Sequence, residues 1–263
     1  MKQHQIKRDG VTLSVREDGP ADGAPVVLLH ALGLDNTIWD ELVAKLPAGL
    51  RIIRPDMRGH GQSDVPPAPY SMGALISDCE AVCEALDVRD AVIVGLSIGG
   101  LIAQGLAVKR LDLVRGLVLS NTAAKLGRPE FWAGRIESAK SGGIGAIADD
   151  TVTRWVGPRG DIGKMTQARA VLMRCNPTGY IGCCAAIAGT DFWTPTSGLR
   201  LPTLGIAGSD DGATPPDLVR ETTDLIPGSR FVLMRRVGHV PPLHDPVAYG
   251  AVISEFLKEI SHG

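Results

Sequence analysis

Short strand-like runs alternate with amphipathic stretches along most of the chain. The runs lie at residues 25–29, 51–54, 91–94, 114–119, 203–207 and 231–237. The stretches between them have the apolar spacing of helices and lie at residues 37–46, 72–86, 98–109, 216–225 and 247–259. Two further strand-like segments flank Asp9-Gly10, a pair that favours a hairpin turn. This alternation predicts a mainly parallel sheet flanked by helices, with its ligand beyond the carboxyl ends of the strands.

The interval 123–193 differs from the rest of the chain in its composition and in its pattern of predicted elements. It contains Gly and Pro breaks, helical patches and no clear strand, and it holds six of the eleven aromatic residues of the chain. Its nine Lys and Arg residues outnumber its six Asp and Glu residues. We interpret this interval as a helical cap inserted before the last two strands. The predicted α/β core then comprises residues 1–122 and 194–263.

Composition excludes several classes of protein. Of the 263 residues, 44% are hydrophobic and 21% are charged, which is typical of globular proteins and rules out disorder. The net charge of −2 offers no general field for nucleic acid. The first residues resemble no signal peptide, and no apolar run is long enough for a membrane span. The five cysteines are an odd number and show no metal spacing. Because no export signal is recognised, we predict a cytoplasmic protein with reduced thiols.

A candidate nucleophile follows the strand-like run at 91–94. Gly95-Leu96-Ser97-Ile98-Gly99 lies between that run and a predicted helix. In this context a G-x-S-x-G motif predicts a tight turn that exposes the serine hydroxyl above a helix N-terminus. The alternative is an ordinary strand–helix turn that uses Gly and Ser for their geometry. We favour the nucleophile because both flanking elements are the ones that the motif requires.

A serine nucleophile needs a general base that an acid holds in one tautomer. His239 follows the last predicted strand, at the sheet edge where it could reach Ser97. The other histidines lie near the chain ends, in earlier loops or at the start of the final helix, at positions 4, 30, 60, 244 and 262. The acid is expected after the preceding strand, where either Asp210 or Asp211 could orient the imidazole.

An oxyanion hole requires two convergent donors. The backbone N–H of Ile98 directly follows the nucleophile, and the second donor should come from the loop after residue 29, where we select the N–H of Leu32. The alternative for this loop is an ordinary turn with a hydrogen-bonded histidine.

Together these residues resemble the α/β-hydrolase fold family, in which Ser, Asp and His follow in this order. Within it, the chain is similar over nearly its full length to the 3-oxoadipate enol-lactonases of the β-ketoadipate pathway. The stretches that carry the similarity are 29–33, 56–64, 95–100, 120–124, 175–186, 211–215 and 238–241. The Asp-x-Ala-Thr-Pro match selects Asp211 as the acid. Ala31 departs from lipase-like relatives, which have glycine there.

The resemblance implies a serine hydrolase that opens 3-oxoadipate enol-lactone through an acyl-enzyme, without a metal or organic cofactor. The implied substrate bears a carboxylate, so the site should contain a cation. Arg135 lies one helical turn from Trp132, and we expect both to face the pocket, pairing with and stacking on the substrate. The competing interpretation is a solvated arginine and a tryptophan that packs the cap.

Two other functions stay open. One is a broad-specificity carboxylesterase or a cofactor-free perhydrolase on the same fold, which would accept simple aryl esters readily. The other is a binding protein in which the pocket serves as a receptor, and only turnover assays separate it from an enzyme. The sequence indicates a small-molecule partner and neither nucleic acid nor a membrane.

Overall fold

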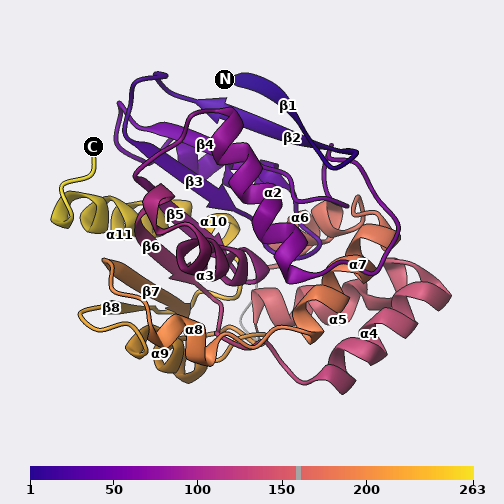
Figure 1. Cartoon of the computed structure of the whole chain (residues 1–263). Coiled ribbons are helices and arrows are strands. Elements are labelled where there is room, and N and C mark those ends of the chain that lie inside the picture. Colours follow the sequence, from indigo (N-terminus) through magenta and orange to yellow (C-terminus); the bar gives the residue numbers. More distant parts are fainter. Residues whose placement is uncertain (158–160) are drawn as a thin grey trace.

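The strand-like runs form one eight-stranded sheet in the computed structural model, which describes residues 1–157 and 161–263 (Figure 1). In spatial order the strands are β1 (Lys2–Arg8), β2 (Val11–Asp18), β4 (Arg51–Pro55), β3 (Pro25–Leu29), β5 (Ala91–Leu96), β6 (Val114–Ser120), β7 (Thr203–Gly208) and β8 (Arg230–Met234). The two pairings of β2 are antiparallel, and the other pairings are parallel. This confirms the predicted mainly parallel sheet.

The turn between β1 and β2 is the predicted hairpin. Arg8 pairs with Val11, so only Asp9 and Gly10 form the loop. Both have positive φ, 48° and 78°, as the favoured two-residue hairpin turn requires.

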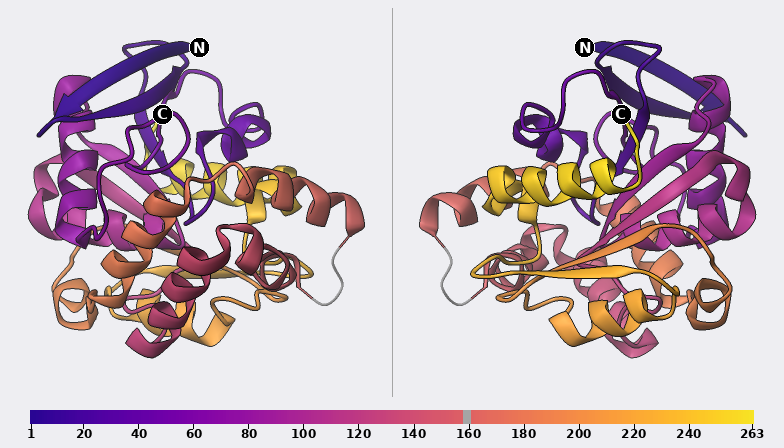
Figure 2. Two further views of the ribbon diagram at one scale, coloured as in Figure 1. Left: turned by 90° about the vertical axis from the view of Figure 1, so that its right-hand side faces the viewer. Right: turned by 90° about the vertical axis from the view of Figure 1, so that its left-hand side faces the viewer.

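Helices cover both faces of the sheet, as predicted. Every residue of β5 and β7 is buried, which explains why these strands are apolar throughout. Figure 1 shows α2 (Met72–Ala85) and α3 (Ile98–Lys109) in front of the sheet, and the views of Figure 2 place α11 (Pro246–Glu259) on the opposite face. The remaining core elements are η1 (Asn36–Trp39), α1 (Asp40–Val43), η2 (Leu111–Leu113), α9 (Pro216–Asp224) and α10 (Pro241–His244).

Between β6 and β7 the chain forms the predicted helical insertion. It lies to one side of the sheet in Figure 1 and contains α4 (Pro129–Gly142), α5 (Gly145–Val156), α6 (Ile162–Leu172) and α7 (Pro177–Ala188). The short helix α8 (Trp193–Ser197) follows the insertion and contacts α3 of the core. The division into core and cap at residues 122 and 193 stays a prediction, and residues 158–160 of that interval lie outside the described part. Within that part, no helix has the length and apolar character needed to cross a membrane.

Some predicted boundaries were wrong. The last strand ends at Met234 and not at residue 237, because Arg236 adopts φ 58° in a turn before the loop of His239. The predicted helix 37–46 is a 3-10 turn, η1, followed by the single-turn helix α1. His244 ends α10, and Asp245 caps α11 by accepting a hydrogen bond from the Ala248 N–H.

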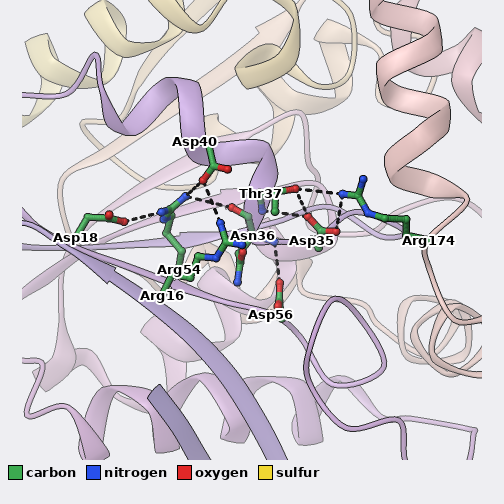
Figure 3. A network of polar contacts seen from close by, with 9 residues as sticks. All are labelled: Arg16, Asp18, Asp35, Asn36, Thr37, Asp40, Arg54, Asp56 and Arg174. Atoms are coloured by element: carbon green, nitrogen blue, oxygen red, sulfur yellow. Dashed lines mark hydrogen bonds and ion pairs between the residues drawn. The ribbon is translucent and has the colours of Figure 1, made fainter. Parts of the chain in front are cut away.

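The cap rests on the core through close backbone packing. A Cβ atom on Gly179 of α7 would lie 1.9 Å from the carbonyl oxygen of Gly59. A second link is ionic, because Arg174 contacts Asp35 at 3.0 Å at one end of a polar network that continues to Arg54 (Figure 3). Arg54 is buried and contacts Asp18 at 2.6 Å. The loop after β3 is therefore tied both to the sheet and to the cap.

Candidate active site

Ser97 lies in the turn between β5 and α3, where the chain reverses within one residue. Its backbone has φ 57° and ψ −117°, a region that non-glycine residues rarely adopt. The turn closes only because its neighbours lack side chains. A Cβ on Gly95 would lie 2.4 Å from the carbonyl oxygen of Gly99, and one on Gly99 would lie 2.2 Å from that of Leu29.

The neighbouring strand β6 holds this turn in place. The Ser97 N–H donates to the carbonyl oxygen of Ser120 at 3.0 Å. The Thr122 hydroxyl donates to the carbonyl oxygen of Ser97 at 2.6 Å. The strained conformation is therefore fixed by one hydrogen bond to the end of β6 and one from the loop that follows it, as the surrounding structure generally fixes strained residues.

Asp211 and His239 form a buried pair. Oδ2 of Asp211 lies 2.8 Å from Nδ1 of His239, and both residues are less than a tenth exposed. Asp210, the alternative acid, accepts a hydrogen bond from the Ser209 hydroxyl at 2.9 Å. The structure thus places Asp211 against the imidazole. With Nδ1 facing the carboxylate, Nε2 is the ring nitrogen left for proton transfer.

The carboxylate of Asp211 is held in its charged form. Burial alone would raise its pKa, but the charge of His239 and hydrogen bonds from His239, Thr214 and Asn121 outweigh burial and lower the pKa. The Thr214 hydroxyl donates at 2.6 Å and the Ala213 N–H at 2.7 Å. A charged, fully hydrogen-bonded acid can orient the imidazole and stabilise its protonated form.

Asn121 is a supporting residue to which the sequence analysis assigned no role. Its side-chain amide donates to Oδ2 of Asp211 at 2.8 Å and to the carbonyl oxygen of Gly238 at 3.2 Å. It therefore joins the loops that carry Asp211 and His239. The sequence contained one indication of a role for Asn121, which is its place in the stretch 120–124. That stretch is one of those in which the chain is similar to the enol-lactonases.

Ser97 and His239 line one pocket, together with Leu32, Trp132 and Arg135. Leu32 follows β3, which pairs in parallel with β5, so its loop lies at the same sheet edge as Ser97. Ile98 is the first residue of α3, where backbone N–H groups have no partner within the helix. The roles of Leu32 and Ile98 as oxyanion donors stay predictions.

Two buried histidines shape the Leu32 loop. Nε2 of His30 accepts the Met57 N–H, and Nε2 of His60 accepts the Gly33 N–H, each at 3.0 Å. Burial lowers the pKa of His60 to about 3, so its ring is neutral and can accept this hydrogen bond at neutral pH. These histidines position the loop and lie outside the acid–base pair.

Trp132 and Arg135 both reach the pocket from α4, as expected for substrate contacts. Trp132 is anchored because its indole N–H donates to the carbonyl oxygen of Leu126 at 2.6 Å. Arg135 is mostly buried and donates to the Tyr180 hydroxyl at 2.6 Å from Nη2 and 3.0 Å from Nε. Their roles in substrate binding stay predictions.

A second arginine, Arg154 of α5, lines the same pocket and was missed by the sequence analysis. Burial and the nearby charge of Arg135 lower the pKa of Arg154. The positive balance of the interval 123–193 hinted at such a residue but could not select it. Two arginines of the cap, Arg135 and Arg154, therefore line the same pocket as Ser97.

The last turn of α5 is joined by main-chain hydrogen bonds to the loops that carry Asp211 and His239. The His239 N–H donates to the carbonyl oxygen of Trp155 at 2.7 Å. The Gly212 N–H donates to the carbonyl oxygen of Arg154 at 3.0 Å. These bonds fix Arg154 relative to Asp211 and His239. Within residues 1–157 and 161–263, no cluster of three or more His, Cys, Asp or Glu side chains could hold a metal.

Comparisons with known proteins identify the fold. A model of the alpha/beta hydrolase fold matches residues 24–246. The 3-oxoadipate enol-lactonase 1 of Acinetobacter baylyi is 30% identical over 96% of both chains. The solved enol-lactonase of Burkholderia xenovorans LB400 is 31% identical, with a TM-score of 0.92 over 98% of this chain and 100% of that one. An esterase of Thermogutta terrifontis is 29% identical, with a TM-score of 0.92 over 100% of both chains.

Proposed function

Because this chain belongs to the alpha/beta hydrolase fold family, we propose that it is a serine hydrolase that converts 3-oxoadipate enol-lactone to 3-oxoadipate. The observation that carries the proposal is a single pocket lined by Ser97, His239 and Arg135. A nucleophile and a base beside a cation suit an ester or lactone that bears a carboxylate. The similarity to the enol-lactonases supplies the lactone and, with it, a role in the β-ketoadipate pathway of aromatic compound degradation.

In the first step, Nε2 of His239 takes the Ser97 proton while Oγ attacks the lactone carbonyl. Asp211 stabilises the imidazolium that forms. The N–H groups of Leu32 and Ile98 bind the tetrahedral oxyanion. Collapse breaks the ring C–O bond and expels an enolate, which His239 protonates and which then tautomerises to the ketone.

In the second step, water completes the reaction. The opened chain stays attached to Ser97 as an acyl-enzyme, so the leaving group is tethered and remains in the pocket. His239 removes a proton from water, which attacks the ester carbonyl. Collapse breaks the bond between the acyl carbon and Oγ of Ser97, His239 returns the proton to Oγ, and 3-oxoadipate leaves with a new carboxylate. Arg135 attracts the carboxylate that the lactone already carries, and Trp132 stacks on the substrate.

The test is ultraviolet-monitored hydrolysis of 3-oxoadipate enol-lactone beside p-nitrophenyl acetate, with the wild type, Ser97→Ala and Ser141→Ala. Ser141 is an exposed cap serine and serves as the matched control. We expect rapid lactone hydrolysis by the wild type and by Ser141→Ala, weak cleavage of the ester, and loss of both activities in Ser97→Ala. Lactone hydrolysis that persists without Ser97 would refute the mechanism.

A broad-specificity carboxylesterase is the second candidate. It is favoured by the esterase of Thermogutta terrifontis, whose fold matches as closely as that of the solved enol-lactonase. A higher kcat/KM for p-nitrophenyl acetate than for the enol-lactone would select this alternative, with Ser97 still the nucleophile.

A further inference from the structure

We propose that His244 is a positioning residue for His239, and that it acts only while its own imidazole is neutral. The inference rests on the proposed function, because it concerns the general base of the same site. It adds that a proton bound by a second histidine, away from the substrate pocket, lowers the activity in acid.

The peptide group that precedes His239 is held on both sides. The Gly238 N–H donates to Nδ1 of His244 at 3.1 Å, and the Gly238 carbonyl oxygen accepts the Asn121 amide at 3.2 Å. The next donor along the chain, the His239 N–H, donates to the carbonyl oxygen of Trp155 at 2.7 Å. Three successive main-chain groups are therefore fixed, and the side chain of His244 supplies one of the three partners.

Gly238 has no room in which to find another acceptor. Gly238 and His239 are both buried, and a Cβ atom on Gly238 would lie 2.0 Å from the carbonyl oxygen of Trp155. A Cβ atom on Gly208 of β7 would lie 2.4 Å from the carbonyl oxygen of Gly238. Because a buried N–H without an acceptor is costly, the loop of His239 must rearrange when His244 no longer accepts.

The single turn of α10 brings His244 back beside Gly238. The His244 N–H donates to the carbonyl oxygen of Val240 at 3.0 Å. The His244 carbonyl oxygen accepts a hydrogen bond from Nζ of Lys164 on α6. The main chain of His244 is thus held by both the core and the cap, so its imidazole is a fixed acceptor.

The His244 ring can accept this hydrogen bond in only one protonation state. With Nδ1 as the acceptor, the ring proton lies on Nε2 and the ring is neutral. An imidazolium carries N–H groups on both nitrogens, so its Nδ1–H would face the Gly238 N–H. Protonation therefore replaces a hydrogen bond by repulsion between two donors, one residue away from His239.

The surroundings of His244 keep its ring neutral at pH 7. Burial, beside a small cavity lined mainly by apolar residues, and the charge of Lys164 lower the pKa of His244 below its ordinary value of 6.5. Opposing charges come from three nearby carboxylates, those of Asp161, Asp210 and Asp245. The helix α1, which also packs against α10, carries the exposed residues Asp40 and Glu41. The ring therefore gains its proton only as the solution becomes acidic.

The first test compares two substitutions of His244 by steady-state hydrolysis of p-nitrophenyl acetate and of the enol-lactone. His244→Leu removes the acceptor and should lower kcat about tenfold. KM should change less than about twofold, since the residues that line the Ser97 pocket do not include His244 in the described part of the chain. His244→Asn places Oδ1 where Nδ1 lies and should recover kcat to within about threefold of the wild type.

The pH profile distinguishes positioning from a general loss of packing. Between about pH 8 and about pH 4.5, the kcat/KM of the wild type should fall about tenfold further than that of His244→Asn, because asparagine binds no proton. His262→Asn is the matched control and should keep the wild-type profile. Burial also lowers the pKa of His262, which contacts Pro25 at the amino end of β3, whereas the Ser97 turn lies at the carboxyl end of the sheet.

A measurement without substrate tests the contact itself. The proton between Nδ1 of His239 and Asp211 should give a far-downfield NMR resonance in the wild type, which His244→Leu broadens and His244→Asn restores. Nitrogen NMR of the ring atoms should show Nδ1 of His244 without a proton at about pH 8. Should His244→Leu fail to fold, the ring nitrogen spectra and the pH profile of His244→Asn decide.

The positioning role is overturned if Nδ1 of His244 carries the ring proton, if His244→Leu keeps the wild-type kcat and the His239 resonance, or if His244→Asn follows the wild-type pH profile. An enzyme that hydrolyses the lactone but gives any of these results keeps the proposed function and loses this role for His244. A protein that hydrolyses neither substrate but shows the expected NMR changes loses the proposed function and keeps the role of His244.

Discussion

Asn121 connects the loop of Asp211 and the loop of His239 through one buried amide. Its Nδ2 donates to Asp211 and to the carbonyl oxygen of Gly238, while its own Oδ1 accepts the Ser120 hydroxyl at 2.9 Å. Its φ of 47° lies in the left-handed region, which asparagine tolerates better than most residues. Asn121 thus acts as a positioning residue for Asp211 and His239.

Asn121→Gly should lower kcat for p-nitrophenyl acetate about tenfold, which corresponds to about 1–2 kcal/mol for the lost hydrogen bonds. KM should change less than about twofold, because the amide supports the acid and not the pocket wall. Glycine adopts a positive φ without strain, so any change in kcat reflects the lost side chain and not a strained backbone. Asp87→Gly, an exposed position with φ 49°, is the control and should leave kcat unchanged. An Asn121→Gly enzyme with wild-type kcat would contradict the positioning role.

His60 should make the protein less stable in acid. Unfolded His60 binds a proton near pH 6.5, whereas burial holds the folded pKa at about 3. Because the folded pKa is the lower one, stability is complete above pH 6.5 and is lost as the pH falls toward 3. This group should contribute a slope of up to about 1.4 kcal/mol per pH unit. Urea unfolding from pH 7 to pH 4 should show a smaller slope for His60→Gln; identical slopes would refute the assignment.

Individual residues differ in how far the sequence could predict them. Ser97 and His239 follow from local motifs and strand order. The choice of Asp211 over Asp210 needed the family resemblance, because adjacent aspartates look alike until the loop is folded. No role could be assigned to Asn121 or Arg154 from the sequence. Asn121 contacts Asp211, which lies 90 residues further along the chain. Arg154 lies near Arg135 only because helices α4 and α5 pack together.

Among the elements, the turn from β5 to α3 depends most sharply on residue size. Gly99→Ala would place a Cβ atom 2.2 Å from the Leu29 carbonyl oxygen, so either α3 or β3 must move. We expect a loss of about 3 kcal/mol in the free energy of unfolding, measured by urea denaturation. Gly134→Ala is the control, because nothing lies within 4 Å of its Cβ position on α4.

The control variant Gly134→Ala should raise the free energy of unfolding, whereas Gly99→Ala should lower it. Alanine favours a helix over glycine, so Gly134→Ala should stabilise the protein by up to about 1 kcal/mol. Equal effects of the two substitutions would show that the turn after β5 tolerates side chains.

Long buried elements were predicted well, and short ones were not. The central strands are apolar on both faces, which makes them visible in the sequence. The single-turn helices α1 and α10 have too few residues to show a periodicity. The predicted end of β8 was three residues too far along the chain, because residues 235–237 continue the strand-like pattern. The positive φ of Arg236, which ends the strand, cannot be seen in that pattern.

At the scale of the whole molecule, backbone packing should hold the cap to the core more firmly than the ionic contact does. Gly179→Ala pushes a Cβ atom against Gly59, and we expect it to cost about 3 kcal/mol in the free energy of unfolding. The helix propensity of alanine offsets at most about 1 kcal/mol of this. Arg174→Ala breaks an ion pair whose arginine side chain is 54% exposed and should cost less than about 1 kcal/mol.

Thermal and urea unfolding of both variants check this order. A larger loss for Arg174→Ala than for Gly179→Ala would show that the polar network of Figure 3 is the main cap–core connection.

The hydrogen bond from His239 to Trp155 has a consequence for protein engineering. Exchanging caps between related hydrolases is a natural route to new substrates, and the obvious graft would replace everything between β6 and β7. Here that graft would also remove the carbonyl groups of Arg154 and Trp155, which the loops of Asp211 and His239 use as acceptors. A chimera that keeps α5 and replaces only α4 should retain a competent acid–base pair, whereas a full exchange needs a donor cap with the same two acceptors.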